Sequence, residues 1–157
     1  MEVEELSSFR RARKFPKLKL IGHIFRREQE IRKAVWEVRN DSAHDSERVG
    51  GGSSGKISSP TEMQAIKAMT PIRKITLADG FWLNRPEDWL KVVDYTYKFF
   101  TADDLPIFQA AAKGVHYKKA CRELGITHGT YYNMLRDGQN YAIAVACQLG
   151  LINIIKM

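Results

Sequence analysis

Residues 117–136, YKKACRELGITHGTYYNMLR, constrain the fold more than any other stretch, because they carry two helical patterns on either side of one glycine. Gly125 can adopt the left-handed conformation that ends many helices. Two residues later, Thr127 can cap a second helix with its hydroxyl group. Ile126, between them, is expected to fill the angle where the two helices meet. The segment therefore predicts two helices joined by a tight turn.

The apolar residues of this segment have the spacing of buried helix faces. Ala120 and Leu124 lie four apart in the first helix and are expected to face the core, where small Cys121 lets the helices approach closely. Tyr131 and Met134 lie three apart and give the second helix its buried face. Together these positions are typical of a helix-turn-helix.

We expect this helix-turn-helix over residues 115–137, with a supporting helix at 115–124 and a second helix at 127–136. Such an arrangement raises the second helix above the surface, so that it can enter the major groove of DNA and contact base edges. The outward residues predicted to contact bases are Thr127, His128, Tyr132, Asn133 and Arg136. The residues predicted to contact phosphates are Lys118, Lys119, Arg122 and Thr130, together with Arg10, Arg11, Arg13 and Lys14 near the N-terminus.

The charge of the chain is concentrated away from this motif. Asn133 suits adenine and Arg136 suits guanine or a phosphate, but Arg136 is the only strong cation of the second helix. Residues 10–33, by contrast, hold ten lysines and arginines against two glutamates, within a chain of net charge +7. We therefore expect the affinity for a polyanion to come largely from this N-terminal segment.

The N-terminal segment also carries a helical stripe, which predicts one long basic helix from about Lys17 to Val38. Its positions alternate between spacings of three and four, with one polar interruption: Ile21, Ile24, Glu28, Ile31, Val35 and Val38. Three roles are open for this helix. It can pack on the domain with a solvated charged back, form a dimer seam, or act as a phosphate-contacting arm.

Residues 40–59 contain four glycines and six serines with almost no apolar surface, which predicts a flexible linker. Gly50, Gly55 and Lys56 match part of a phosphate-binding loop, but Ile57 stands where Ser or Thr would hold magnesium. The expected domains are thus a basic segment at 1–39, the linker at 40–59 and a helical domain at 60–157.

Within the helical domain, further helices are expected before the helix-turn-helix. Ser59 and Pro60 predict a helix start, and a second short helix is expected to run to Ala78 and end at Gly80. A clear amphipathic helix follows Pro86, and another begins at Asp103 or Asp104 and ends at Gly114. The buried face of the amphipathic helix is expected to be Leu90, Val93, Tyr97 and Phe100. The aromatic residues Trp82, Trp89, Tyr95 and Phe99 are also expected in the core rather than in a base-stacking platform.

Several function classes find no support in the sequence. The four histidines lie far apart, and Cys121 and Cys147 sit in helical apolar patterns, so we expect no metal site, no cofactor and no enzymatic activity. No apolar run approaches the roughly 18 residues of a membrane span. The N-terminus lacks the layout of a secretory signal, and we expect a cytoplasmic protein.

Four segments of the sequence carry a family resemblance: GGGSSGKISSPTEMQAIKAM at residues 50–69, the aromatic-rich helix that follows, GITHGTYYNMLR, and AVACQLGLI at residues 144–152. Through them the sequence resembles the RinA family of bacteriophage transcriptional activators, and less closely the related ArpU group. The resemblance implies an activator of late packaging and morphogenesis genes, with a C-terminal helix-turn-helix similar to the promoter-reading region of sigma factors. It also implies a promoter target and contact with host RNA polymerase.

The sequence therefore predicts a mainly α protein: a helical bundle with a C-terminal sigma-like helix-turn-helix and a basic N-terminal helix. We expect a homodimer that binds double-stranded promoter DNA in the bacterial host, in association with the nucleoid. One alternative is a terminase small subunit, which recognises DNA for packaging. The other is a basic helical module that binds an acidic protein and no nucleic acid.

Overall fold

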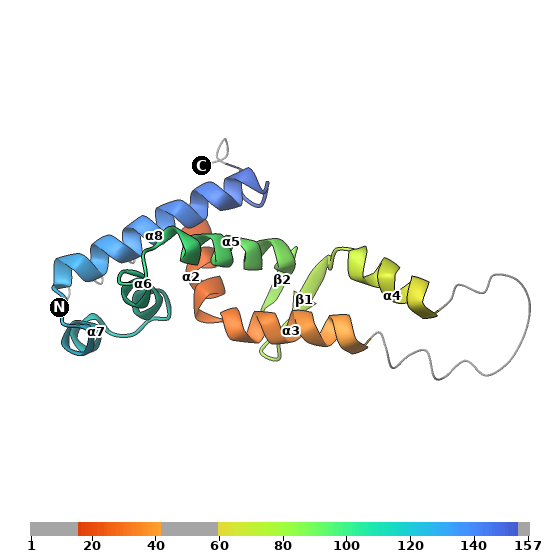
Figure 1. Ribbon diagram of the computed structural model, residues 1–157, viewed down its shortest axis with the longest axis horizontal. Helices are drawn as coiled ribbons and strands as arrows, with labels where there is room; N and C mark the ends of the chain where they lie inside the picture. Colours follow the sequence, from red (N-terminus) through yellow and green to blue (C-terminus); the bar gives the residue numbers. More distant parts are fainter. Residues whose placement is uncertain (1–15, 42–59, 154–157) are drawn as a thin grey trace, which may run out of the picture. The chain divides into compact units, whose positions relative to one another are not determined.

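The computed structural model of the chain describes residues 16–41 and 60–153. In this part the chain is mainly helical with one small two-stranded sheet, which confirms the expected fold class (Figure 1). The elements are α2 (Pro16–Arg26), α3 (Glu28–Asp41), α4 (Pro60–Met69), β1 (Lys74–Thr76), β2 (Trp82–Asn84), α5 (Pro86–Phe99), α6 (Leu105–Ala112), α7 (Tyr117–Leu124) and α8 (His128–Gln148). No helix among these described residues is long and apolar enough to cross a membrane.

The described residues form two compact units. One unit contains residues 16–28 and 88–153, and the other contains residues 29–41 and 60–87. Helix α2 packs against α6 and α8, so that this part of the basic segment belongs to the same unit as the C-terminal helices.

The single long N-terminal helix expected from the sequence is wrong, because the chain breaks at Arg27 into α2 and α3. The break comes directly before Glu28, the one polar residue of the apolar stripe. The carboxylate of Glu28 is buried and accepts a 2.5 Å hydrogen bond from the Tyr97 hydroxyl of α5. Burial of this carboxylate requires such a partner. The polar interruption in the stripe thus coincides with a change in the path of the chain.

Aromatic rings fill the core of the first unit around Phe108, whose side chain has no solvent exposure. Phe108 makes an edge contact with Phe25 of α2 at 5.3 Å and stacks on Phe100 at 4.6 Å, measured between ring centroids. Tyr97 of α5 lies 6.2 Å from the same ring. Such edge and stacked contacts add to the free energy gained by burial.

Helix α8 crosses this core at a glycine. Gly138 is buried in the middle of α8, and a Cβ atom at this position would overlap the ring of Phe108. The absence of a side chain therefore lets the backbone of α8 approach the α6 helix that carries Phe108. Because α8 continues to Gln148, the second helix is longer than the expected 127–136.

A β-hairpin replaces the short helix expected to end at Ala78. Residues 74–76 pair antiparallel with residues 82–84, and Ile75 opposes Leu83. The side chains alternate between exposed and buried along both strands, which is the period of a strand. Gly80 has the positive φ expected of it, at 88°, but it serves the hairpin turn instead of a helix end. Asp-Gly between alternating apolar residues is a strong hairpin signal.

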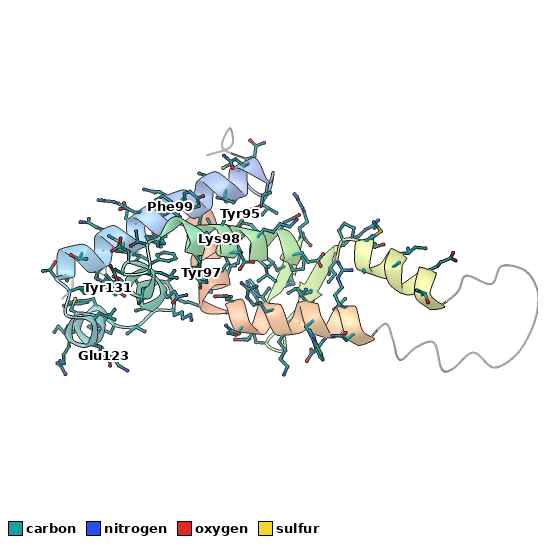
Figure 2. The ribbon with its side chains drawn as sticks, in the orientation of Figure 1. Tyr95, Tyr97, Lys98, Phe99, Glu123 and Tyr131 are labelled. Atoms are coloured by element: carbon teal, nitrogen blue, oxygen red, sulfur yellow. The ribbon has the colours of Figure 1, made fainter. Side chains whose placement is uncertain are left out.

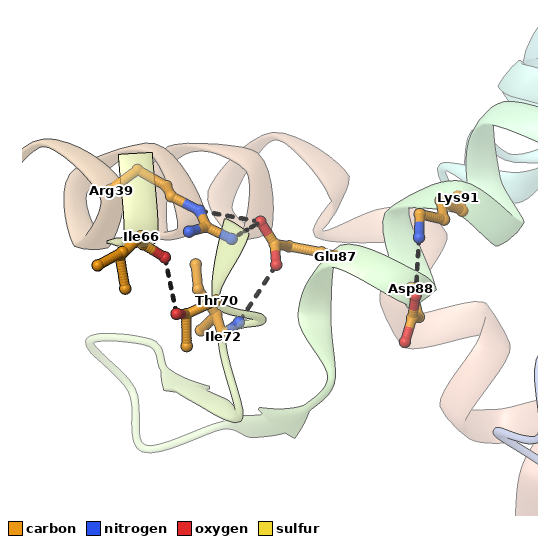
Figure 3. A network of polar contacts seen from close by, with 7 residues as sticks. All are labelled: Arg39, Ile66, Thr70, Ile72, Glu87, Asp88 and Lys91. Atoms are coloured by element: carbon orange, nitrogen blue, oxygen red, sulfur yellow. Dashed lines mark hydrogen bonds and ion pairs between the residues drawn. The ribbon is translucent and has the colours of Figure 1, made fainter. Parts of the chain in front are cut away.

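A polar contact joins helix and hairpin segments in the second unit (Figure 3). The guanidinium of Arg39 in α3 donates to one carboxylate oxygen of Glu87, from Nη2 at 2.6 Å and from Nε at 3.0 Å. The other carboxylate oxygen accepts from the backbone N–H of Ile72 at 3.2 Å. Charge-assisted bonds of this kind are stronger than neutral ones and fix geometry.

The amphipathic helix expected after Pro86 is confirmed in α5, since Leu90 and Val93 are buried while Tyr97 and Phe100 are half-buried. The core assignment of the other aromatic residues holds for Trp89 only. Three rings are about half exposed, because they lie on the outer faces of β2 and α5: Trp82, Tyr95 and Phe99.

The contact at Gly138 predicts that replacing a helical glycine by alanine changes the free energy of unfolding differently at Gly138 and at Gly22. Gly138→Ala should lower the free energy of unfolding by about 1–3 kcal/mol, because the methyl group overfills a packed core. Gly22→Ala in α2 meets nothing within 4 Å and should raise it by about 0.5–1 kcal/mol through helix propensity. Urea unfolding followed by circular dichroism measures both. Equal effects of the two substitutions would contradict the close approach of α8 to Phe108.

Candidate nucleic-acid interface

Helix α6 forms the base of the candidate interface. Asp104 occupies the N-cap position, as expected, but its side chain makes no capping hydrogen bond, and Pro106 lies in the first turn. The helix ends before Gly114, where φ is 80°, and the backbone N–H of Val115 donates back to the Ala110 carbonyl at 3.0 Å. This tight turn ends α6 and leads directly to the start of α7 at Tyr117.

Helix α7 is capped by histidine and ended by glycine. The Nδ1 atom of His116 accepts from the backbone N–H of Lys118 at 3.3 Å. Gly125 adopts the left-handed conformation with φ 64° and ψ 34°, which confirms its expected role, and its backbone N–H donates to the Cys121 carbonyl. The N–H of Ile126 donates to the same carbonyl at 3.2 Å. Two donors on one carbonyl fix a tight end of the helix.

Thr127 begins the next helix in the way its sequence position predicts. Its backbone is extended, and its hydroxyl oxygen accepts from the backbone N–H of Thr130 at 3.2 Å. The two threonine hydroxyls also share a 2.9 Å hydrogen bond. A side-chain cap of this kind stabilises a helix by about 1 kcal/mol.

A small core holds α6, α7 and α8 together. Its buried members are Ala111, Ala120 and Tyr131, one from each helix. Tyr131 is labelled in Figure 2. Ile126 packs against this core from the turn, as expected, and so does Leu135 from α8. Ala120 is therefore correctly predicted as a core residue. Leu124 is not, because its side chain is 39% exposed at the end of α7.

Tyr131 ties α8 to the chain that precedes α7. Its hydroxyl donates to the backbone carbonyl of Val115 at 2.6 Å. Burial raises the pKa of this hydroxyl above its ordinary value, because the ionised form loses solvation. The neutral form, which can donate the hydrogen bond, is thereby favoured.

The residues predicted to contact bases lie in the first turns of α8 and at its N-cap, Thr127. Thr127, Asn133 and Arg136 are exposed, and Tyr132 is 38% exposed. His128 is half-buried. The guanidinium Nε of Arg136 lies 3.6 Å from a carboxylate oxygen of Asp137, and both side chains remain about half exposed. This surface offers an amide, a guanidinium and hydroxyl groups to a ligand.

The predicted phosphate contacts lie on the neighbouring helix where the structure describes them. Lys118, Lys119 and Arg122 are exposed on α7, while Thr130 is half-buried in its bond to Thr127. Lys119 lies 3.8 Å from Glu123, which stands on the side of α7 away from α8 (Figure 2). The remaining four predicted contacts, Arg10, Arg11, Arg13 and Lys14, lie outside the described residues.

One cation of the N-terminal segment reaches this region. Arg26, the last residue of α2, is exposed, and a Cβ atom at Gly114 would lie 3.2 Å from its Nε atom. Its guanidinium thus stands beside the turn that leads into α7.

Four rings meet where α7 and α8 begin, a convergence that the sequence alone does not predict. We call them the aromatic cluster: His116, Tyr117, His128 and Tyr132. Tyr117 stacks on His116 at 4.7 Å and meets His128 edge-on at 4.7 Å. His128 lies 4.6 Å from Tyr132. The residues of the two helices were assigned separately from the sequence, so their convergence was visible only after both helix starts were placed.

The sequence also raises the question of a metal site, of paired cysteines and of a phosphate-binding loop. The described residues include no set of three or more histidine, cysteine, aspartate or glutamate side chains that could hold a metal ion. Cys121 and Cys147 are half-buried free thiols. The loop containing Gly50 and Lys56 lies outside the described residues.

Comparison of the chain with protein-family models, with curated proteins and with solved structures found no significant match.

The environment of Tyr131 predicts a loss of stability at alkaline pH. Because its pKa is raised in the folded state, the unfolded chain loses this proton first, near pH 10, and the stabilisation fades as the pH rises through the folded value. Tyr131→Phe should cost about 1 kcal/mol at pH 8 through the lost hydrogen bond. It should also reduce the fall in stability between pH 9 and pH 11. Urea unfolding across this range tests both effects, and an unchanged alkaline slope in the variant would contradict them.

Proposed function

We propose that this chain binds double-stranded DNA sequence-specifically, with the first turns of α8 (residues 127–136) in the major groove. The observation that carries the proposal is the capped start of α8, held against α6 and α7 by Ala120 and Tyr131 while its polar side is exposed. The major groove admits an α-helix and presents a distinct pattern for each base pair. A helix with fixed orientation and exposed polar residues is suited to read that pattern.

Asn133 and Arg136 are the principal base readers in this proposal. The amide of Asn133 can bond to N6 and N7 of adenine, and the guanidinium of Arg136 can bond to O6 and N7 of guanine. Both side chains are exposed and lie three residues apart, so they share one face of α8. Thr127 and His128 lie at the start of α8, as its N-cap and its first residue.

Affinity comes from cations beside the reading helix. Lys118, Lys119 and Arg122 extend the exposed surface along α7, and Arg26 stands at the turn before it. Arg10, Arg11, Arg13 and Lys14 supply further phosphate contacts in the proposal. Each phosphate that a cation neutralises releases counterions, which makes such binding depend on salt.

The resemblance to the RinA family supports a narrower role, in which a homodimer activates late bacteriophage genes from their promoter in the cytoplasm of the bacterial host. The DNA partner is then a promoter, and host RNA polymerase is a second partner. A reporter gene driven by the late promoter distinguishes this role, because transcription should rise when the chain is expressed. A terminase small subunit would bind a packaging site and leave the reporter unchanged.

The reading assignment predicts that two substitutions remove sequence preference. Duplexes selected by the full chain from a random library should bind Asn133→Ala and Arg136→Ala at least about fivefold more weakly, because each base contact contributes about 1–3 kcal/mol. Binding to unselected duplex should change little for Asn133→Ala. Fluorescence anisotropy at fixed salt measures both affinities.

Two controls separate reading from general affinity. Asn140→Ala removes an equally exposed asparagine farther along α8 and should leave binding unchanged. Replacing Arg10, Arg11, Arg13 and Lys14 by glutamine should weaken selected and unselected duplexes together and reduce the slope of log affinity against log salt by about 3–4. These substitutions keep α2 intact, whereas deletion of residues 1–39 would remove the core residue Phe25. Retained preference in both α8 variants would contradict the proposal.

A further inference from the structure

The aromatic cluster occupies the point where the two helices of the interface begin. Tyr117 is the first residue of α7, and His128 is the first residue of α8, with Tyr132 one turn later. Their ring centroids lie within 4.6–6.1 Å of one another. Tyr132 and Arg136 lie four residues apart, so this ring shares a face of α8 with the Arg136 side chain.

The cluster has a fixed inner part and an accessible outer part. Tyr117 is half-buried and packs against the core formed by Ala111, Ala120 and Tyr131. Tyr132 is 38% exposed, and its ring also meets Tyr131 at 5.1 Å. Rings that already contact each other lose little conformational freedom when a ligand covers them, which favours binding.

The chemistry of this surface differs from that of its neighbours on α8. Asn133 and Arg136 offer hydrogen-bond donors, whereas the exposed part of the Tyr132 ring offers apolar surface. In the major groove, thymine alone among the four bases carries an apolar group on its edge, the methyl group at C5. The exposed ring surface of Tyr132 thus matches the methyl group on the major-groove edge of a thymine.

We propose that the aromatic cluster, and Tyr132 in particular, is a contact surface for the C5 methyl group of thymine, which makes Tyr132 a specificity-determining residue. The inference rests on the proposed function, because it requires the start of α8 to lie in the major groove. It adds that apolar contact, and not only hydrogen bonding, selects the DNA sequence. Cytosine methylated at C5 presents the same methyl group and is a second source of the same chemistry.

The test removes the thymine methyl group from the DNA and the Tyr132 ring from the protein, first separately and then together. In a duplex selected by the full chain, replacing each conserved thymine in turn by deoxyuridine deletes only a methyl group. At one such position, binding of the wild-type chain should weaken about fourfold, the value of one buried methyl group. In Tyr132→Ala the same replacement should have no effect, while Tyr132→Phe should keep the fourfold sensitivity.

Matched controls show whether the response to deoxyuridine comes from Tyr132 and from the methyl group at C5. Tyr95→Ala removes another exposed tyrosine, 49% exposed on α5, and should keep the response to deoxyuridine. A duplex with a G·C pair at the sensitive position should bind more tightly when its cytosine carries the C5 methyl group. Circular dichroism of Tyr132→Ala verifies that the variant is folded.

The outcomes separate this inference from the function on which it rests. If no sequence is enriched from the random library, the proposed function fails, and the inference fails with it. If sequences are enriched but deoxyuridine has no effect, or has an equal effect in Tyr132→Ala, only the inference is overturned. Tighter binding of the single strand than of the duplex would also overturn it, because the rings would then serve to stack on unpaired bases.

Discussion

Phe108 occupies the position in the first unit where residues from four helices meet. Its ring contacts Phe25 of α2, lies near Tyr97 and stacks on Phe100 after α5, and leaves room for α8 only because residue 138 is glycine. A fully buried ring with this many neighbours tolerates little change in volume, since protein interiors are close-packed. The path of α8 across the core is thus fixed by one ring and one missing side chain.

This constraint extends to the candidate interface through the rigidity of α8. The helix runs from His128 to Gln148 without interruption, a length of about 30 Å. Its middle is fixed at Gly138, and its first turns are fixed again by the Thr127 cap and by the bond from Tyr131 to Val115. Two separated points of attachment define the direction of a helix. The polar residues at its start are therefore presented by a scaffold and not by a loop.

The sequence predicted features that depend on local chemistry. The left-handed Gly125 and the cap at Thr127 follow from residues within one turn, and the buried side of α5 follows from helical spacing. Features that depend on distant partners were missed. The break before Glu28 accompanies a bond to Tyr97, sixty-nine residues away, and the aromatic cluster required both helix starts to be placed. The hairpin at residues 74–84 was missed for another reason: Gly80 also suits a helix end, and the hairpin signal of Asp79-Gly80 between alternating apolar residues was given too little weight.

The central claim is that the first turns of α8 occupy the major groove, and a dimethyl sulfate footprint of the selected duplex tests it most directly. The reagent methylates N7 of guanine, which faces the major groove, and N3 of adenine, which faces the minor groove. The account predicts that the bound chain protects guanine N7 within the selected sequence and leaves adenine N3 reactive. Protection of adenine N3 with reactive guanine N7 would contradict it.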